Sequence, residues 1–101
     1  MMYDASNIKK LKKFAELTPA AWEGFLAFDK AVMADGAISS RNKELIAIAV
    51  AMTTQCPYCI DIHTKKAKAA GCSDAEIAEA VMVAAALRAG GALTHGTHSF
   101  E

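Results

Sequence analysis

Hydrophobic residues recur at helical spacing along most of this chain, whereas the alternation typical of a half-buried strand is not sustained and β-branched residues are sparse. The pattern therefore predicts an all-α fold. No internal repeat or linker divides the chain, so we expect a single domain over residues 1–101. We expect helices that begin after Ser6 and run to Leu17, from Pro19 to Ala34, from Ser39 or Ser40 through Met52, from Pro57 to Ala70, and from Ser73 through Leu87 and beyond.

Short capping signals mark several of these helix ends. Thr18 followed by Pro19 has the order of an N-cap residue and a proline at the first helical position. The spacing from Ser73 to Glu76 is that of a capping box, which should start the last helix. The pair Gly90-Gly91 should either end that helix or mark a place where another backbone comes close.

Two of these helices should supply most of the core. The second carries an aromatic stripe, including Trp22 and Phe25, that is most simply buried. The third is apolar on nearly every side between Leu45 and Met52, which is typical of a central helix. This longest apolar run falls far short of the roughly 20 residues that a bilayer-spanning helix needs, so we expect no membrane segment.

Composition narrows the function classes. Of 101 residues, 53% are hydrophobic but only 7% are aromatic, which favours close-packed helices rich in alanine and aliphatic side chains. Eleven basic and eleven acidic residues balance, so neither nucleic acid nor an acidic membrane surface is an expected partner. The N-terminus lacks a charged stretch followed by an apolar one, so we expect a soluble, cytoplasmic protein. Three cysteines are too few for a secreted disulfide scaffold, and an intracellular Cys-x-x-Cys pair is more often catalytic or metal-binding.

The segment Cys56-Pro57-Tyr58-Cys59 carries the strongest chemical signal. One helical turn brings positions i and i+3 to the same face, so two cysteines at this spacing can close a small disulfide ring. Pro57 suits the first helical position and places Cys56 at the helix entrance, where unpaired N–H groups and the helix dipole favour a thiolate. The thiolate is the nucleophile, and a free thiol with a pKa of about 8.5 is mostly protonated at neutral pH. We therefore predict a site that cycles between a dithiol and a disulfide, with Cys72 as a spectator.

Two further residues are candidates for proton transfer. His63 lies one turn after Cys59 on the same predicted face, where an imidazole can take the proton of a cysteine. Glu44 can orient His63 and stabilise its charged form, or it can simply be an exposed acid near the start of its helix. Contact between the two side chains requires the third helix to end or bend before Cys56, and Thr53-Thr54-Gln55 can supply that break.

A zinc site is an alternative use of the same residues. A structural zinc ion takes four ligands in a tetrahedron. Cys56, Cys59 and His63 supply three, and His95 or His98 is a conceivable fourth if the C-terminal tail folds back. In a third alternative, the protein is a non-catalytic oligomeric binding protein with inert thiols. The residues by themselves leave these alternatives open.

The span from Glu44 to His63 has the pattern Glu-x11-Cys-x2-Cys-x3-His, and an alanine-rich helix containing Gly90-Gly91 follows it. This arrangement resembles the alkylhydroperoxidase D-like core of the carboxymuconolactone decarboxylase superfamily, over roughly Phe25 to His95. The resemblance implies an all-α domain of about five to six helices, assembled into trimers or hexamers and free of metal or organic cofactor. Independently, a domain this small and apolar leaves aliphatic surface that self-association would cover.

The resemblance also implies roles for four residues. In that family the second cysteine of the pair attacks a peroxide, the first resolves the sulfenic acid as a disulfide, and the histidine and glutamate relay a proton. Carried over, Cys59 attacks, Cys56 resolves, His63 is the base and Glu44 is its partner. The implied activity is that of a thiol-dependent peroxidase or disulfide oxidoreductase. Its substrate would be a peroxide or a disulfide, and its reductant a dithiol or a thioredoxin-like protein.

Two details refine this implied activity. The chain has Tyr58 where the best-studied peroxidases of the family have a histidine, a departure that bears on peroxide turnover more than on dithiol cycling. Members of the family that decarboxylate lactones lack the cysteine pair. Carboxymuconolactone decarboxylase activity is therefore the less favoured of the activities that the resemblance implies.

Overall fold

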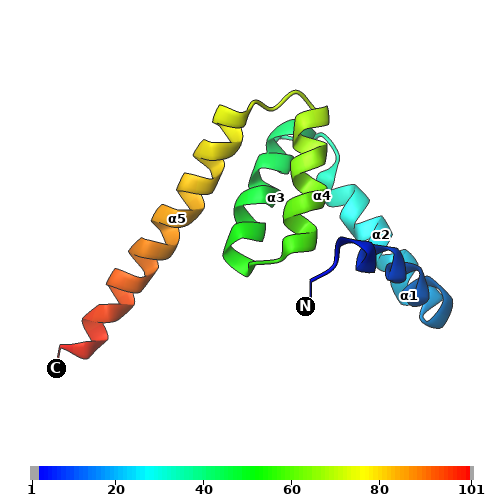
Figure 1. Ribbon diagram of the computed structural model, residues 1–101, viewed down its shortest axis with the longest axis horizontal. Helices are drawn as coiled ribbons and strands as arrows, with labels where there is room; N and C mark the ends of the chain where they lie inside the picture. Colours follow the sequence, from blue (N-terminus) through cyan, green and yellow to red (C-terminus); the bar gives the residue numbers. More distant parts are fainter. Residues whose placement is uncertain (1–2, 101) are drawn as a thin grey trace. The chain divides into compact units, whose positions relative to one another are not determined.

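The computed structural model describes residues 3–100, which contain five α-helices, two 3-10 helices and no strand. The all-α prediction is confirmed, and four of the predicted helices are present with starts that differ by only a residue or two, but the first is split into a 3-10 helix over Ala5–Leu11 and a short α-helix over Lys12–Leu17. The residues fall into two compact units, Met1–Ser40 and Arg41–Glu101, so the single domain over the whole chain stays a prediction. In order, the elements are η1 (3-10, Ala5–Leu11), α1 (Lys12–Leu17), α2 (Pro19–Met33), α3 (Ser40–Thr54), α4 (Pro57–Ala69), α5 (Asp74–Gly96) and η2 (3-10, Thr97–Ser99) (Figure 1).

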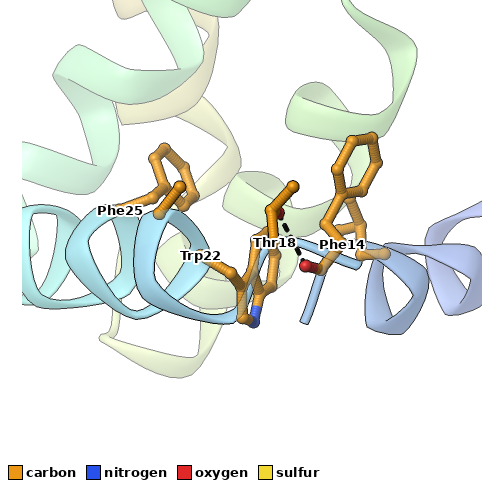
Figure 2. A pocket seen from close by; sticks show the side chains of 6 residues that line it. Phe14, Thr18, Trp22 and Phe25 are labelled. Carbon is orange, nitrogen blue, oxygen red and sulfur yellow. Dashed lines mark hydrogen bonds between the residues drawn. The ribbon is translucent and has the colours of Figure 1, made fainter. Parts of the chain in front are cut away.

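Local hydrogen bonds set the helix ends of the first unit. Asp4 caps η1, because its Oδ1 accepts the Ser6 hydroxyl at 2.8 Å and the Ser6 N–H at 2.9 Å, and both bonds lower the pKa of the Asp4 carboxyl. Thr18 lies at the N-cap position of α2, but its hydroxyl donates to the Phe14 carbonyl oxygen at 2.7 Å (Figure 2). The predicted cap is therefore wrong in its bonding. The threonine hydroxyl closes α1 instead, since the carbonyl four residues earlier is its nearest acceptor.

Aromatic side chains of α1 and α2 stack along an open groove of about 370 Å³ (Figure 2). The ring centroids of Phe14 and Trp22 lie 6.4 Å apart, and those of Trp22 and Phe25 lie 5.8 Å apart. The expectation that this stripe is core is wrong for this chain, because Trp22 is half-buried and Phe25 is 56% exposed. About forty residues of helix contribute too few side chains to enclose their own aromatic rings. The groove is completed by Leu11, Thr18 and Ala21.

In the second unit, α3 and α4 form an antiparallel pair (Figure 1). The α3 helix begins at Ser40, whose N–H is bonded to Asp35 Oδ1 at 2.6 Å. Its expected central position is confirmed for one face only: Ile48 is fully buried, whereas Ile46 and Val50 on the other side are about half exposed, at 49% and 53%. The buried cluster consists of Ile48, Ala67 and Cys72, with Leu45, Met52, Ile77 and Val81 packed around it.

The α5 helix begins with the predicted capping box. Ser73 Oγ accepts the Glu76 N–H at 3.1 Å, and Glu76 Oε1 accepts the Ser73 N–H at 2.9 Å. The helix then runs through Gly90-Gly91 to Gly96, so the prediction that this pair could end it is wrong. Within the described residues, no other part of the chain lies within 4 Å of a side-chain carbon built on either glycine. The flanking alanines and leucines favour the helix enough to carry it past both glycines.

The two faces of α5 differ sharply. One face lies toward α3 and α4, where Ile77 and Val81 pack on the cluster and Ala84 is buried. Large side chains on the other face are exposed to solvent. By length and composition, the stretch Asp74–Ser99 is long and apolar enough to cross a membrane, a test that core helices of soluble proteins also pass. The search of the sequence for a long uninterrupted apolar run did not find this stretch, because isolated charged residues interrupt it. The exposed side chains, between 58% and 77% accessible, are Met82, Val83, Leu87 and Leu93.

Candidate functional site

The α3 helix ends in a turn that reverses the chain. Gln55 has a φ of 56°, in the left-handed region, and the Cys56 N–H reaches back to the Ala51 carbonyl oxygen at 3.3 Å. A left-handed residue followed by this six-residue bond is the Schellman ending of a helix. The predicted break in Thr53-Thr54-Gln55 is therefore present at Gln55, and it lets α4 return beside α3.

The residue that completes this turn also begins α4. Cys56 has an extended backbone and is the N-cap, and Pro57 occupies the first turn, as predicted. Cys56 Sγ accepts the Cys59 N–H at 3.3 Å, the bond that a serine or aspartate oxygen makes at this position. Both thiols are free, with their Sγ atoms 2.8 Å apart. An approach of less than about 1 Å would bring them to the S–S bond length of about 2.05 Å.

The two thiols have opposite electrostatic environments. The Cys59 thiol and backbone N–H, together with the Tyr58 N–H, donate to the Cys56 sulfur and lower the pKa of Cys56 against a small opposing effect of burial. The same thiol–thiol bond, then burial and the nearby charge of Cys56, raise the pKa of Cys59. Of the two thiols, Cys56 is thus the more readily ionised.

Glu44 and His63 form the second pair of the site. Glu44 is only 6% exposed, and its Oε2 lies 2.7 Å from His63 Nδ1. The alternative in which Glu44 is an exposed acid is therefore wrong, because a buried carboxylate requires a polar partner and His63 supplies it. A carboxylate only accepts hydrogen bonds, so Nδ1 carries the proton and Nε2 of the neutral ring keeps a free lone pair.

The structure thus joins the four predicted residues as two pairs. Cys56 contacts Cys59 at the start of α4, and His63, on the next turn, contacts Glu44 of α3. In the described part of the chain, no hydrogen bond links a thiol to the His63 ring. Transfer of a proton between the pairs requires a small side-chain movement or a bridging water, as is common in the resting state of catalytic sites. The catalytic roles of the four residues stay a prediction.

The ligand set of the predicted zinc site is not assembled. His95 and His98 lie together near the C-terminal end of α5, with ring centres 5.7 Å apart. Across residues 3–100, no three or more side chains of histidine, cysteine, aspartate or glutamate form a group that could hold a metal ion. The tetrahedron considered from the sequence, with a C-terminal histidine joining the cysteines, is therefore not formed.

Both arginines of the chain bind carbonyl groups near the ends of α3 and α4, and neither role was predicted from the sequence. Arg88 Nη1 donates to the Thr53 carbonyl oxygen at 2.6 Å, which ties α5 to the end of α3. Arg41 Nη2 donates to the Gly71 carbonyl oxygen at 3.4 Å and to Glu76 Oε2 at 2.7 Å. A signal was available for Arg88, because a lone arginine in an alanine-rich helix suggests a specific acceptor.

The amino-acid sequence of this chain is similar to those of a known protein family and of several known proteins. The family model for the carboxymuconolactone decarboxylase family matches residues 19–101. A curated relative, "Uncharacterized protein 4 in cox locus" from Paracoccus denitrificans, is 52% identical over 73 residues, which are 72% of this chain and 66% of that protein. An uncharacterized protein from Haemophilus influenzae is 38% identical over 65 residues, 61% of this chain and 56% of that protein. The chain therefore spans less than two thirds of the length of these relatives.

Two solved structures share the fold. A protein from Methanobacterium thermoautotrophicum superimposes with a TM-score of 0.83 at 36% identity, over 87% of this chain and 99% of that one. A carboxymuconolactone decarboxylase family protein from Legionella pneumophila, in its apo form, gives a TM-score of 0.77 at 32% identity, over 81% of this chain and 73% of that one. The sequence match and these structures confirm the resemblance found in the residues, and the chain belongs to the carboxymuconolactone decarboxylase family.

Proposed function

We propose that this protein is a thiol-dependent oxidoreductase that cycles Cys56 and Cys59 between a dithiol and a disulfide. The observation that supports this most is the place of the pair in the fold. Cys56 is the N-cap of α4, and its Sγ lies 2.8 Å from Cys59 Sγ. Such a position stabilises a thiolate and keeps a second thiol within bonding reach, the two requirements of a redox-active pair.

The Glu44 and His63 pair supports the same function by providing a base. Disulfide formation releases protons, and an imidazole with a free Nε2 lone pair can accept one at neutral pH. Glu44 Oε2, 2.7 Å from Nδ1, fixes the tautomer and stabilises the imidazolium that results. The family includes enzymes, and the substrate of this one is, in our proposal, a peroxide or a disulfide. The thiols need no metal or organic cofactor for this chemistry, and a dithiol or thioredoxin-like protein would return them to the reduced form.

Thiol counting tests the proposal directly. In a Cys72→Ala background, which removes the buried third thiol, one equivalent of hydrogen peroxide or oxidised glutathione should abolish the two protein thiols per chain, counted after small thiols are removed, and dithiothreitol should restore both. Metal analysis of the same sample, purified without added zinc, tests the competing zinc-binding function. Stoichiometric zinc with two thiols that resist both oxidants would refute the redox proposal.

We also propose that the protein works as a soluble homo-oligomer, as a trimer or a multiple of three. The family match supports a soluble protein, and the exposed face of α5 supports self-association, because four large apolar side chains on one helix are costly to leave in water. Light scattering at micromolar concentration should give a multiple of the 10.7 kDa chain mass. A mass near that of one chain would contradict self-association, and recovery only from a membrane fraction would contradict solubility.

A further inference from the structure

Cys56 and Cys59 differ in how a substrate can approach them. Cys56 lies in the two-residue link between α3 and α4, and its neighbours Gln55 and Pro57 are both exposed. Cys59 lies within the first turn of α4, between the half-buried side chains of Tyr58 and Ile60. The two cysteines are themselves both of intermediate exposure, so the difference lies in their neighbours: a substrate that approaches Cys56 meets exposed residues, and one that approaches Cys59 meets half-buried ones.

Hydrogen bonding distinguishes the two sulfurs as well. Cys56 Sγ is the acceptor of the Cys59 N–H at 3.3 Å, at the end of α4 where the helix dipole is positive. A negative charge on Cys56 is therefore stabilised by groups that are already in place. We infer that Cys56, rather than Cys59, attacks the substrate, that the substrate is an organic disulfide, and that it is held as a mixed disulfide on Cys56. This inference rests on the proposed function and reverses the order of attack that the family resemblance implies for peroxide.

The two steps balance without any further reactant. In the first, the Cys56 thiolate attacks one sulfur of R–S–S–R′, the substrate S–S bond breaks, and R′–S⁻ leaves and takes a proton from water. In the second, Cys59 gives its proton to His63 Nε2 and attacks the Cys56 sulfur, and R–S⁻ leaves and is protonated in turn. The protein loses two electrons as the Cys56–Cys59 disulfide forms, and the substrate gains them as two thiols.

The acidities of the two thiols fit this division. The pKa of Cys56 is lowered by its hydrogen bonds, so it is the more readily ionised of the two thiols and attacks first. The pKa of Cys59 is raised by its bond to Cys56 and by burial, so it needs a base before it can attack. Once Cys56 is joined to the substrate, its charge and that bond are lost, but burial still disfavours the Cys59 thiolate. His63, one turn further along α4, is then the base for resolution.

Trapping with oxidised glutathione tests the inference. In the Cys72→Ala background, Cys59→Ser leaves Cys56 with a hydroxyl donor in place of the second thiol. It should accumulate a mixed disulfide on Cys56, seen by mass spectrometry. Cys56→Ser should form its adduct at least about tenfold more slowly at pH 7, because the remaining Cys59 does not occupy the N-cap position, where an N–H of α4 stabilises a thiolate. Cys59→Ala lacks the side-chain donor. The pH at which the rate of adduct formation on Cys56 reaches half its maximum should therefore be higher in Cys59→Ala than in Cys59→Ser.

A second measurement uses the protein with both thiols present, so that it does not depend on whether the cysteine variants fold. Brief alkylation of the reduced protein with iodoacetamide at pH 6, followed by peptide mapping, should label Cys56 before Cys59. Faster capture by Cys56→Ser than by Cys59→Ser, or first labelling of Cys59, would overturn the inference while leaving dithiol cycling intact. If the protein with both cysteines fails to close its disulfide with either oxidant, the proposed function itself fails. The two failures are thus distinguishable.

Discussion

The ends of α3 and α4 are built alike but differ in chemistry. Each helix closes with a left-handed residue, Gln55 or Gly71, followed by a cysteine whose N–H reaches back five residues, to Ala51 and Ala67 respectively. An arginine from elsewhere in the second unit holds a carbonyl at each turn. Similar backbone geometry therefore places Cys56 and Cys72 at equivalent positions.

The start of the next helix distinguishes the two cysteines. Cys56 is itself the N-cap of α4, so its sulfur receives an N–H of that helix. After the second turn the N-cap of α5 is Ser73, and Cys72 lies buried with its Sγ 3.9 Å from the Arg41 carbonyl oxygen. The N-cap of the next helix is therefore the cysteine itself after the first turn and the residue after the cysteine after the second. Because of this difference of one residue, Cys56 lies at the positive end of a helix and Cys72 lies in the core. The turn alone does not place a thiol at the N-terminus of a helix.

The largest expected effect comes from removing one cysteine at a time. Cys56→Ser should reduce turnover with a disulfide substrate by at least about a thousandfold, because the nucleophile is gone. Cys72→Ala should leave turnover within about twofold and lower the stability by about 1 kcal/mol, since a small buried side chain is lost. Steady-state rates and urea unfolding of both variants give the comparison. Comparable losses of turnover would mean that the two turns are not chemically distinct.

The next effect concerns His63, the proposed base, which lies one turn of α4 beyond Cys59 and therefore follows only the first of the two turns. His63→Ala should slow release of the mixed disulfide by about a hundredfold while leaving its formation nearly unchanged, because the base acts on Cys59 alone. Glu44→Gln should have a smaller effect in the same direction, since the amide can donate to Nδ1 and favour the wrong tautomer. Rapid-quench mass spectrometry resolves the two steps. Equal slowing of both would show that His63 supports the fold rather than the resolution.

Local signals predicted this second unit better than packing did. Ser73 and Glu76 formed the expected capping box, and the break at Gln55 brought Glu44 to His63, because caps and turns depend on neighbours within a few residues. The carbonyls held by Arg41 and Arg88 lie 30 and 35 residues away in sequence, and no periodicity specifies them. The exposed Phe25 shows the same limit, because an amphipathic pattern indicates a face to be covered but not what covers it.

A more moderate effect is expected at the left-handed residues themselves. Gly71 has a φ of 91°, so Gly71→Ala should destabilise the protein by about 1–2 kcal/mol. Gln55 has a φ of 56° with a full side chain, so Gln55→Gly should stabilise it by up to about 1 kcal/mol, less the entropy that glycine adds to the unfolded chain. Urea midpoints measure both changes. If Gln55→Gly also slowed capture by Cys56, the side chain of Gln55 would have a role in the site beyond the turn.

The smallest effect should come from the ion pair at the second turn. Bonds from Arg41, and then from the Ser73 N–H, lower the pKa of Glu76 from 4.5 to about 2, and Arg41 also holds the Gly71 carbonyl. Because the pKa is depressed in the folded protein, this stabilisation is complete above about pH 4.5 and is lost as the pH falls toward 2. The side chains are about a third exposed, at 37% and 36%, so solvent screens the pair and the effect should stay below that of Gly71→Ala.

Glu76→Gln tests the contribution of this pair against the parent protein. Urea midpoints should differ most near neutral pH and converge between about pH 4.5 and 2, the window set by the two pKa values of Glu76. Subtracting one curve of urea midpoint against pH from the other removes the contribution of the other carboxyl groups to the pH dependence. These groups include Asp4, whose pKa is also lowered. Capture of glutathione by Cys56 should be the same in both proteins. A constant difference across this pH range would mean that Glu76 acts through the neutral capping box alone, and that the second turn does not depend on its charge.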